Sequence, residues 1–365
     1  MLPLPSCKSL AALAALTLTA CGNAAPAPPS PSPSPSPSPS PAWTQIELPA
    51  AGGAVLLRDV ADCAGEWYVA GAVRGADGTT RPAAWTSTDG RAWQSLRFSP
   101  LPSSYYGPHD VISSVACAAG RVVMVGALPG GAHGNPRVST WRRLADGRMA
   151  ENAATFETYG GDRAVNVGRV GAGPKGFVIA GNRTSGAAAW LSADGQAFTL
   201  FEGVPGLAGD ATHETMARDA VALPDGRWAI VGGVAAHDSL DESAAVWVSG
   251  DGRAWTRADP PAAPGFNEIQ RVVRQGDDLL AAGARGTAFG LWRWHAGTWT
   301  VAGTFGGDSG GVRSLTVAGG EPVVAGGGLW VAGDAWETPA PPVAVAGRGS
   351  TLLMATDDRL WQASA

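Results

Sequence analysis

The sequence predicts an all-β fold assembled from repeats of one small unit. Gly contributes 51 of the 365 residues and Trp contributes 15, which indicates many tight turns and many large apolar anchors. From Trp43 onward the chain also repeats: two apolar strands are followed by a loop of variable length, a strand that carries Trp, and a short turn into a fourth strand. A repeat of this kind predicts the architecture more reliably than any single residue does.

The Trp of the third strand fixes the phase of the repeat. It occurs seven times, at Trp85, Trp141, Trp190, Trp247, Trp292, Trp330 and Trp361. In six copies a large apolar residue follows after 8, 8, 8, 8, 7 and 6 residues, at Trp93, Met149, Phe198, Trp255, Trp299 and Trp336. This near-constant spacing is typical of a short hairpin with a bulky side chain on each strand.

The seventh copy lacks its fourth strand, because the chain stops four residues after Trp361. Residues 42–45 (AWTQ) match the fourth-strand sequences at 254–257 (AWTR) and 92–95 (AWQS). We therefore predict a seven-bladed β-propeller of four-stranded antiparallel blades over residues 43–365. A strand at 43–48 completes the last blade and closes the ring, which removes an exposed sheet edge.

Three of the predicted hairpins share the pattern S-x-D-G-x-x-aromatic, at residues 87–93, 192–198 and 249–255. The pattern resembles the Asp-box repeat of sialidase-like propellers, shortened by one residue between Asp and the aromatic. Gly tolerates positive φ in such a turn, and the Asp side chain can accept turn amides. The resemblance implies a fold rather than an activity, and we interpret these Asp residues as structural.

The N-terminus reads as an export signal for a lipoprotein. Residues 10–18 form an apolar run that is too short to span a bilayer. The run ends in Leu18-Thr19-Ala20-Cys21, which resembles a bacterial lipobox and implies cleavage before Cys21 and diacylation of its thiol. We expect a signal peptide over residues 1–20. An ordinary signal peptide followed by a chance Cys is the alternative.

Residues 21–42 are predicted to form a lipidated tether, because Ala, Pro and Ser dominate them and a Ser-Pro repeat fills 30–41. Alternating Pro favours extended polyproline II, so twenty such residues can reach roughly 60 Å. We expect a lipid-anchored protein on the extracytoplasmic side of the cell membrane. Only two Lys accompany 24 Arg among the 26 basic residues, and with much Ala and Gly this favours an actinobacterial source.

The balance of acidic and basic residues indicates which classes of partner the protein can bind. Lys and Arg total 26 against 31 Asp and Glu, a formal net charge of −5, which argues against a nucleic-acid binder. No metal-ligand spacing or cofactor motif is recognisable, so we expect neither a metal nor a cofactor, and we expect a monomer.

Two cysteines remain in the predicted propeller. Cys63 and Cys117 follow the first strands of the first two blades at near-equivalent positions. Adjacent inner strands bring such positions close, and an exported protein meets an oxidising compartment, so we predict a disulfide. Two buried free thiols are the alternative.

Candidate ligand-binding residues fall in two places. The longer loops should share one face of the propeller, and they carry Tyr105, Tyr106, His109, Asp110, His133, His213 and Glu214. The first strands line the central channel and carry Arg58, Arg169, Asp219 and Arg271.

Each candidate has a second interpretation. His109, Asp110 and His133 could form a metal site or an acid–base pair, or be ordinary loop residues. The two Tyr could stack on a sugar ring or cover their own loop. The channel Arg could hold a carboxylate or phosphate, or form structural ion pairs.

We expect a non-enzymatic binding or interaction module whose partner, an unknown protein or glycan, meets the loop-rich face. No catalytic constellation stands out. A secreted sialidase-like glycoside hydrolase or lyase is one alternative, although the Arg-Ile-Pro signature is absent and seven blades replace the six of sialidases. No catalytic residue of that family can be assigned here. A purely structural envelope component is the other alternative.

Overall fold

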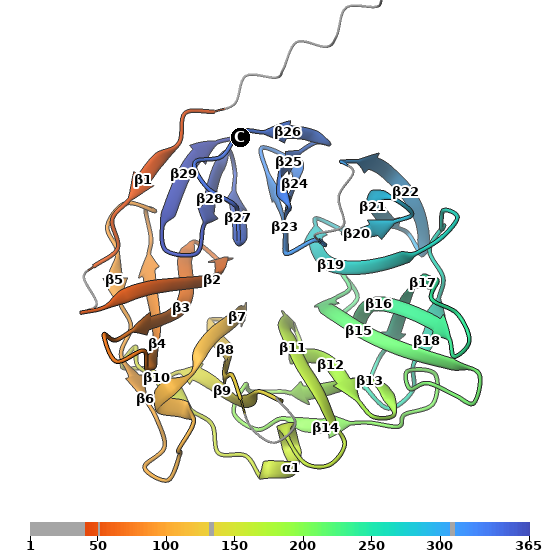
Figure 1. Cartoon of the computed structure of the whole chain (residues 1–365), viewed down its shortest axis with the longest axis horizontal. Helices are drawn as coiled ribbons and strands as arrows, with labels where there is room; N and C mark the ends of the chain where they lie inside the picture. The colour runs from red at the N-terminus through yellow and green to blue at the C-terminus, as the bar shows by residue number, and fades with distance from the viewer. Residues whose placement is uncertain (1–40, 50–51, 131–134, 307–310) are drawn as a thin grey trace, which may run out of the picture. The chain divides into compact units, whose positions relative to one another are not determined.

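The computed structural model describes residues 41–49, 52–130, 135–306 and 311–365. The predicted signal peptide, Cys21, nearly all of the tether and His133 lie outside these ranges. The described chain forms seven sheets around a common axis, with β2, β7, β11, β15, β19, β23 and β27 innermost (Figure 1). This confirms the predicted seven-bladed β-propeller.

The first four blades follow the chain in order. Blade 1 contains β2 (Ala54–Cys63), β3 (Glu66–Arg74), β4 (Thr80–Ser87) and β5 (Gln94–Ser95). Blade 2 contains β7 (Val111–Ala118), β8 (Arg121–Leu128), β9 (Arg137–Arg143) and β10 (Met149–Glu151). Blade 3 contains β11 (Ala164–Gly173), β12 (Gly176–Arg183), β13 (Gly186–Ser192) and β14 (Thr199–Phe201). Blade 4 contains β15 (His213–Ala222), β16 (Trp228–Ala236), β17 (Glu242–Ser249) and β18 (Thr256–Ala258).

The last three blades complete the ring. Blade 5 contains β19 (Asn267–Gln275), β20 (Asp278–Arg285), β21 (Ala288–His295) and β22 (Thr298–Phe305). Blade 6 contains β23 (Ser314–Ala318), β24 (Glu321–Gly326), β25 (Gly328–Val331) and β26 (Asp334–Trp336). Blade 7 contains β27 (Ala344–Arg348), β28 (Thr351–Ala355), β29 (Leu360–Ser364) and the N-terminal strand β1 (Thr44–Ile46). Two short helices, η1 (Gly107–His109) and α1 (Phe156–Tyr159), lie in the loops.

The N-terminal strand closes the ring as the sequence predicts. β1 pairs antiparallel with β29, so that Thr44 lies opposite Gln362 and Ile46 opposite Leu360. Blade 2 departs from the four-stranded prediction, because β6 (Phe98–Ser99) adds a fifth strand parallel to β10. Phe98 packs edge-on against Trp141 at 5.1 Å between ring centroids, a contact that holds the incoming chain against this blade.

The third-strand Trp residues anchor the core between blades. Five of them are less than 2% exposed: Trp85, Trp141, Trp190, Trp247 and Trp292. The apolar clusters that contain them draw residues from two neighbouring blades, as with Val178 of blade 3 and Trp228 of blade 4. Blade-to-blade packing therefore fixes the positions of the loops.

The antiparallel topology gives the propeller two unlike faces. The hairpin face carries the turns from first to second strand and from third to fourth strand. The loop face carries the connections from second to third strand and from each blade to the next. Both names are used in this sense below.

Short hydrogen-bonded turns build the hairpin face. Asp89 Oδ1 accepts from the backbone N–H groups of Arg91 and Ala92 at 2.8 Å, and Ser87 Oγ accepts from that of Gly90 at 2.9 Å. Those backbone N–H donors lower the pKa of Asp89 to about 2. The other two S-x-D-G hairpins repeat the pattern around Asp194 and Asp251.

A basic side chain from the preceding blade contacts each S-x-D-G hairpin. Arg348 Nη1 donates to the carbonyl oxygen of Thr88 at 3.1 Å, and Arg348 also lies 4.1 Å from the ring centroid of Trp67. Arg121 donates in the same way to Ala193 at 2.6 Å, and Lys175 to Gly250 at 3.0 Å. The S-x-D-G hairpins thus serve as attachment points between blades.

Candidate functional site

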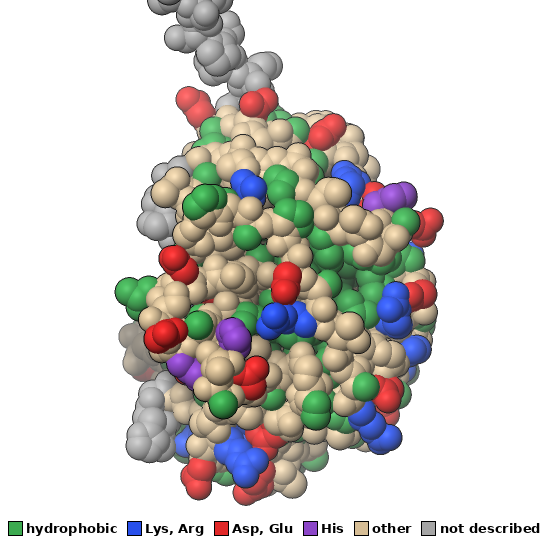
Figure 2. Space-filling model, turned by 90° about the vertical axis from the view of Figure 1, so that its right-hand side faces the viewer, with side chains coloured by type: hydrophobic (Ala, Val, Ile, Leu, Met, Phe, Trp, Pro, Cys, Tyr) green, Lys and Arg blue, Asp and Glu red, His purple; other side chains and the backbone are tan. Residues whose placement is uncertain are grey.

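Apolar side chains gather on the loop face. Of the seven large hydrophobic residues that are exposed within the described ranges, six lie in its loops or at strand ends that open onto it: Tyr105, Tyr106, Phe156, Val165, Leu240 and Phe266. The seventh, Val301, lies on β22. On the flank of the ring in Figure 2, acidic, basic and apolar side chains lie interspersed. Clustered exposed apolar groups mark interaction sites more often than scattered ones do.

The blade 2 pocket, of about 350 Å³, lies among these side chains. Its lining comes from the loop before η1, the start of β9, and the segment from β10 to α1. Its aromatic and charged side chains are Tyr105, Tyr106, Arg137, Glu151, Phe156 and Tyr159. Tyr105 is 75% exposed and Phe156 is 57% exposed, so aromatic surface is open to solvent here.

Arg137 lies between two aromatic rings of this pocket. Its guanidinium carbon is 5.7 Å from the ring centroid of Tyr106 and 5.0 Å from that of Phe156. Tyr105 meets Tyr106 edge-on at 5.0 Å between centroids. Arg137 Nε is buried and has no hydrogen-bond acceptor among the described residues. The pocket therefore holds a guanidinium that contacts two aromatic rings and has no ion-pair partner in the described part of the chain.

Glu151 lines the pocket, and both of its carboxylate oxygens accept hydrogen bonds from the protein. Its Oε2 accepts from the backbone N–H of Leu101 at 2.9 Å, and its Oε1 accepts from Ser104 Oγ at 2.7 Å and Ser139 Oγ at 3.1 Å. These bonds fix the loop that carries Tyr105 and Tyr106. We interpret Glu151 as a positioning residue.

Asp110 is buried beside the pocket but does not line it. Its Oδ2 accepts from Trp141 Nε1 at 3.1 Å, while its Oδ1 has no partner in the described part of the chain. Burial raises the pKa of Asp110 to about 8, although the hydrogen bond from Trp141 acts in the opposite direction, and the charge of Glu151 makes a smaller contribution that also raises it. A pKa in this range favours the protonated form of Asp110 at neutral pH.

His109 turns away from Asp110 toward blade 1. Its Nδ1 lies 3.2 Å from the carbonyl oxygen of Thr80, whose hydroxyl donates to the carbonyl oxygen of His109. The two side chains thus have separate partners, which favours the interpretation as loop residues over an acid–base pair. Within the described ranges, no three His, Cys, Asp or Glu side chains converge as a metal site would require.

A second pocket, of about 360 Å³, lies between blades 3 and 4 on the loop face and contains the other two sequence candidates. His213 Nδ1 is 3.4 Å from Asp210 Oδ1, and Glu214 Oε1 is 3.5 Å from His237 Nδ1. His237 Nε2 also lies 3.1 Å from the backbone oxygen of Asp210. Each imidazole therefore lies beside a carboxylate of the loops that surround the pocket.

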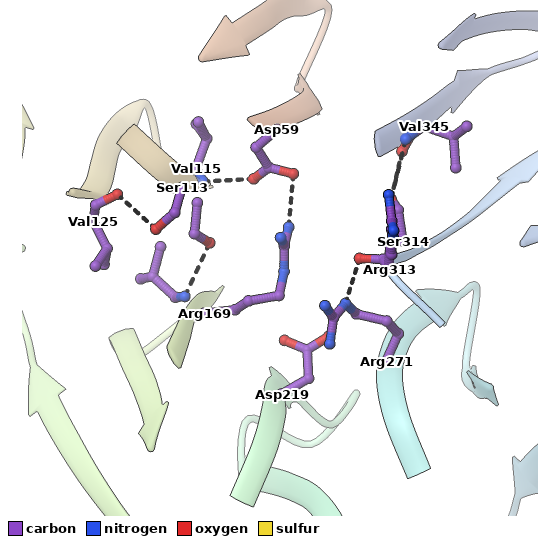
Figure 3. A network of polar contacts seen from close by, with 12 residues as sticks. Asp59, Ser113, Val115, Val125, Arg169, Asp219, Arg271, Arg313, Ser314 and Val345 are labelled. Atoms are coloured by element: carbon purple, nitrogen blue, oxygen red, sulfur yellow. Dashed lines mark hydrogen bonds and ion pairs between the residues drawn. The ribbon is translucent and has the colours of Figure 1, made fainter. Parts of the chain in front are cut away.

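The channel candidates belong to a ring of polar residues at one equivalent position of the innermost strands. Blades 1 to 6 contribute, in order, Asp59, Ser114, Arg169, Asp219, Arg271 and Ser314. A β-bulge disturbs the strand just before this position in blades 1, 2, 4 and 5 and around it in blade 3. The two acidic and two basic side chains turn toward one another across the axis (Figure 3).

Each charged member of the ring has a partner. Arg169 Nη2 reaches Asp59 Oδ1 at 2.8 Å, and Asp59 Oδ2 accepts from the backbone N–H of Val115 in the next blade at 2.8 Å. Asp219 Oδ2 accepts from the N–H of Val272 at 3.1 Å, and Arg271 Nε donates to the carbonyl oxygen of Arg313 at 2.6 Å. The ring therefore connects neighbouring blades around the axis.

Burial sets the direction of the pKa shift of two of these groups, Asp219 and Arg271. It raises the pKa of Asp219, although the nearby Arg169 and Arg271 act in the opposite direction. It lowers the pKa of Arg271 to about 10, with a further contribution from the charge of Arg169. Arg58, one residue before the ring position, pairs with Asp357 of blade 7 at 2.9 Å. These contacts favour structural ion pairs over an anion site for the channel arginines.

Cys63 and Cys117 are joined by a disulfide, with a Cα–Cα distance of 5.7 Å. The bond links the ends of β2 and β7 at the hairpin face of blades 1 and 2. A crosslink between residues 54 positions apart restricts the unfolded chain, and this stabilises the folded protein by about 4 kcal/mol.

The sequence candidates leave out four residues that complete the blade 2 pocket, and the pairing of two loop-face carboxyl groups was not predicted. Arg137, Glu151, Phe156 and Tyr159 show no spacing that would single them out, because loops of different length bring them together. Glu242 lies beside Glu268, and burial together with the charge of Glu268 raises the pKa of Glu242 to about 8. Glu268 forms an ion pair with Arg218.

No protein-family model matches the chain, and no curated protein matches its sequence. Fold and site together define a seven-bladed β-propeller with an open aromatic pocket on its loop face. Neither short helix in the described ranges has the length or apolar character to span a bilayer.

Solved structures match the fold at low identity. Virginiamycin B lyase from Staphylococcus aureus is 14% identical with a TM-score of 0.59, and the match covers 89% of this chain and 99% of that one. The Cps50 (Swd1) β-propeller domain of Myceliophteria thermophila is 12% identical with a TM-score of 0.54, covering 90% and 100%. PorZ, a surface component of the type-IX secretion system of Porphyromonas gingivalis, is 12% identical with a TM-score of 0.52, covering 84% and 46%. These likenesses show the fold alone.

Proposed function

We propose that the protein is a lipid-anchored, extracytoplasmic propeller that acts as a non-enzymatic binding module through its loop face. The observation that carries this proposal is the gathering of exposed apolar side chains on that face, three of which, Tyr105, Tyr106 and Phe156, line the blade 2 pocket. A rigid scaffold that presents an aromatic-lined pocket with a few fixed polar groups is typical of a binding site.

The N-terminal sequence supplies the anchor in this proposal. The lipobox-like segment ending at Cys21 and the Ser-Pro repeat support export, lipidation and display at a distance from the membrane. Metabolic labelling with a fatty-acid analogue tests this part: the intact protein should carry the label and Cys21→Ala should not. Equal labelling of both would contradict it.

The folds of the solved structures do not select an activity, because a lyase, a Swd1 propeller domain and a secretion component share the architecture. One observation favours a hydrolase or lyase as a second candidate: Asp110 and Glu242 are loop-face carboxyl groups with a pKa near 8. Neither lines the blade 2 pocket or the pocket between blades 3 and 4, so binding remains our proposal.

A ligand panel tests the loop face directly. The melting temperature of the protein is measured with cell-wall fragments, neutral and acidic glycans, small carboxylates, and metals with a chelator control. A ligand at a hundred times its Kd stabilises by about 2.7 kcal/mol, which shifts the melting temperature by several degrees.

Two double variants locate any such shift. We expect Tyr106→Ser with Phe156→Ser, on the loop face, to abolish it. The matched change on the hairpin face, Arg91→Ser with Arg253→Ser, should leave it intact. A shift that survives the first pair and disappears with the second would contradict the proposal, and so would the absence of any shift. The latter outcome would favour a purely structural envelope component.

A further inference from the structure

We propose that the blade 2 pocket binds a carboxylated sugar ring, with the carboxylate on Arg137 and the ring against the aromatic side chains beside it. This rests on the proposed function and gives its loop face a ligand class.

The guanidinium of Arg137 contacts two aromatic rings, and its Nε is buried whereas neither Nη is among the buried unpaired atoms. The rings of Tyr106 and Phe156 contact it, yet the side chain makes no hydrogen bond or ion pair with any described residue. An arginine presents a planar fork of N–H donors that matches a carboxylate with two parallel hydrogen bonds. The two Nη atoms can therefore donate both hydrogen bonds to one carboxylate.

The pocket does not neutralise this charge. Glu151 is the acidic residue among its lining residues, and both carboxylate oxygens already accept hydrogen bonds from Leu101, Ser104 and Ser139. Moving Glu151 toward Arg137 would leave those donors without an acceptor, at a cost of about 1–3 kcal/mol for each buried group. The positive charge is therefore available to a ligand.

The remaining lining fits a sugar ring better than a purely apolar one. Tyr105 and Tyr106 offer aromatic surface, against which the C–H face of a sugar ring can pack. Both Tyr and Ser103 line the pocket, and no hydrogen bond joins their hydroxyls to another described residue. A volume of about 350 Å³ suits a ligand of one or two rings.

Calorimetric titration of the full chain tests the inference. The probes are D-glucuronate, D-glucose and benzoate, which separate the carboxylated sugar from its neutral counterpart and from an apolar carboxylate. We expect D-glucuronate to bind at least about tenfold more tightly than either of the others, and we expect added salt to weaken its binding. Equal affinities, or no detectable binding of D-glucuronate, would overturn the inference.

Three variants assign the contact to Arg137. Arg137→Met should weaken D-glucuronate binding by about tenfold or more, because it removes the fork and keeps much of the side-chain length. Arg137→Lys should give an intermediate Kd, because it keeps the charge and loses the planar geometry. The control, Arg74→Met, changes an exposed arginine of the loop face outside the pocket and should leave the Kd unchanged.

Unfolding curves accompany these titrations, so that a loss of folding is not read as a loss of binding. An unchanged Kd in a folded Arg137→Met variant would overturn the inference. If D-glucuronate does not bind while the ligand panel still identifies a loop-face ligand, this inference fails and the proposed function stands. If the panel finds no loop-face ligand either, both fail.

Discussion

The two faces of the propeller differ in how completely their polar groups are hydrogen-bonded. On the hairpin face, the S-x-D-G turns repeat one set of hydrogen bonds, and Arg348, Arg121 and Lys175 connect each of these turns to the preceding blade. Buried polar atoms without a partner occur mainly on the other side. Of the seven in the described chain, four belong to side chains near the loop face and one, Gln275 Oε1, to the hairpin face; the four are Asp110 Oδ1, Arg137 Nε, Glu242 Oε1 and Arg285 Nε.

This difference indicates which parts of the molecule maintain the fold and which are available for binding. On the hairpin face, repeated hydrogen bonds stabilise the ring. On the loop face, unpaired polar groups and exposed aromatic rings lower the stability of the folded protein, and we interpret them as groups available for binding.

Removing a core anchor should be far more costly than removing a loop-face ring of similar chemistry. Trp190 is fully buried, so Trp190→Ala should lower the free energy of unfolding by about 3–5 kcal/mol. Phe156 is 57% exposed, so Phe156→Ala should cost less than about 1 kcal/mol. Urea denaturation measures both. Equal costs would mean that Phe156 is part of the core rather than of a binding surface.

The polar ring in the channel should behave as a structural element. Arg169→Met leaves Asp59, which is 1% exposed, without its cation, and we expect a loss of about 3–5 kcal/mol in unfolding free energy. Adding Asp59→Asn should restore part of it, because the uncompensated charge is removed. A single variant as stable as the parent protein would reopen the interpretation of the channel arginines as a ligand site.

Asp110 should make the loop face sensitive to pH. Its pKa in the folded protein is about 8 against an unfolded value near 3.8, so the folded state holds an extra proton between these values. This contribution to stability is fully present below pH 4 and is lost as the pH rises toward 8. Asp110→Asn should therefore melt at a higher temperature than the parent protein at pH 9, and the advantage should shrink toward pH 4.

The control for this effect is Asp162→Asn, an exposed carboxyl group on the same face. Its melting temperature should follow that of the parent protein across the pH range. A pH profile that Asp110→Asn leaves unchanged would show that Asp110 is ionised in the folded protein at neutral pH.

The smallest of these effects concerns the contacts between blades on the hairpin face. Arg348 donates to Thr88, pairs with Asp62 and lies over Trp67. Arg348→Met should lower the unfolding free energy by about 1–2 kcal/mol. Arg74→Met, which removes an exposed arginine on the loop face, should change it by less than about 0.5 kcal/mol. Similar costs at both positions would remove the contrast between the faces.

The fold could be predicted well from the sequence because residues close together in the chain encode each copy of the repeat. The regular position of Trp141 or Trp190 relative to the next strand, and the likeness of residues 42–45 to other fourth strands, set the number of blades and the closure. The extra strand β6 was not predictable, since it depends on how one connection crosses to its neighbour.

The candidate site was predictable only in part, because non-repeating loops build it. Tyr105 and Tyr106 stood out as adjacent aromatic residues, and the structure places both in the blade 2 pocket. Arg137 and Phe156 come from separate segments with no common period, so only the folded chain reveals that a guanidinium lies between two rings. In the channel, the charges of Arg169 and Asp59 were visible in the sequence, but their pairing across the axis was not.

Hydrogen–deuterium exchange of the full chain, with and without D-glucuronate, tests most directly the claim that the loop face binds at blade 2. We predict slower exchange in the segments that line the pocket, residues 101–106, 136–139 and 151–160, and no change in the hairpins at 87–93, 192–198 and 249–255. Protection confined to the hairpins or to the channel strands would contradict the account.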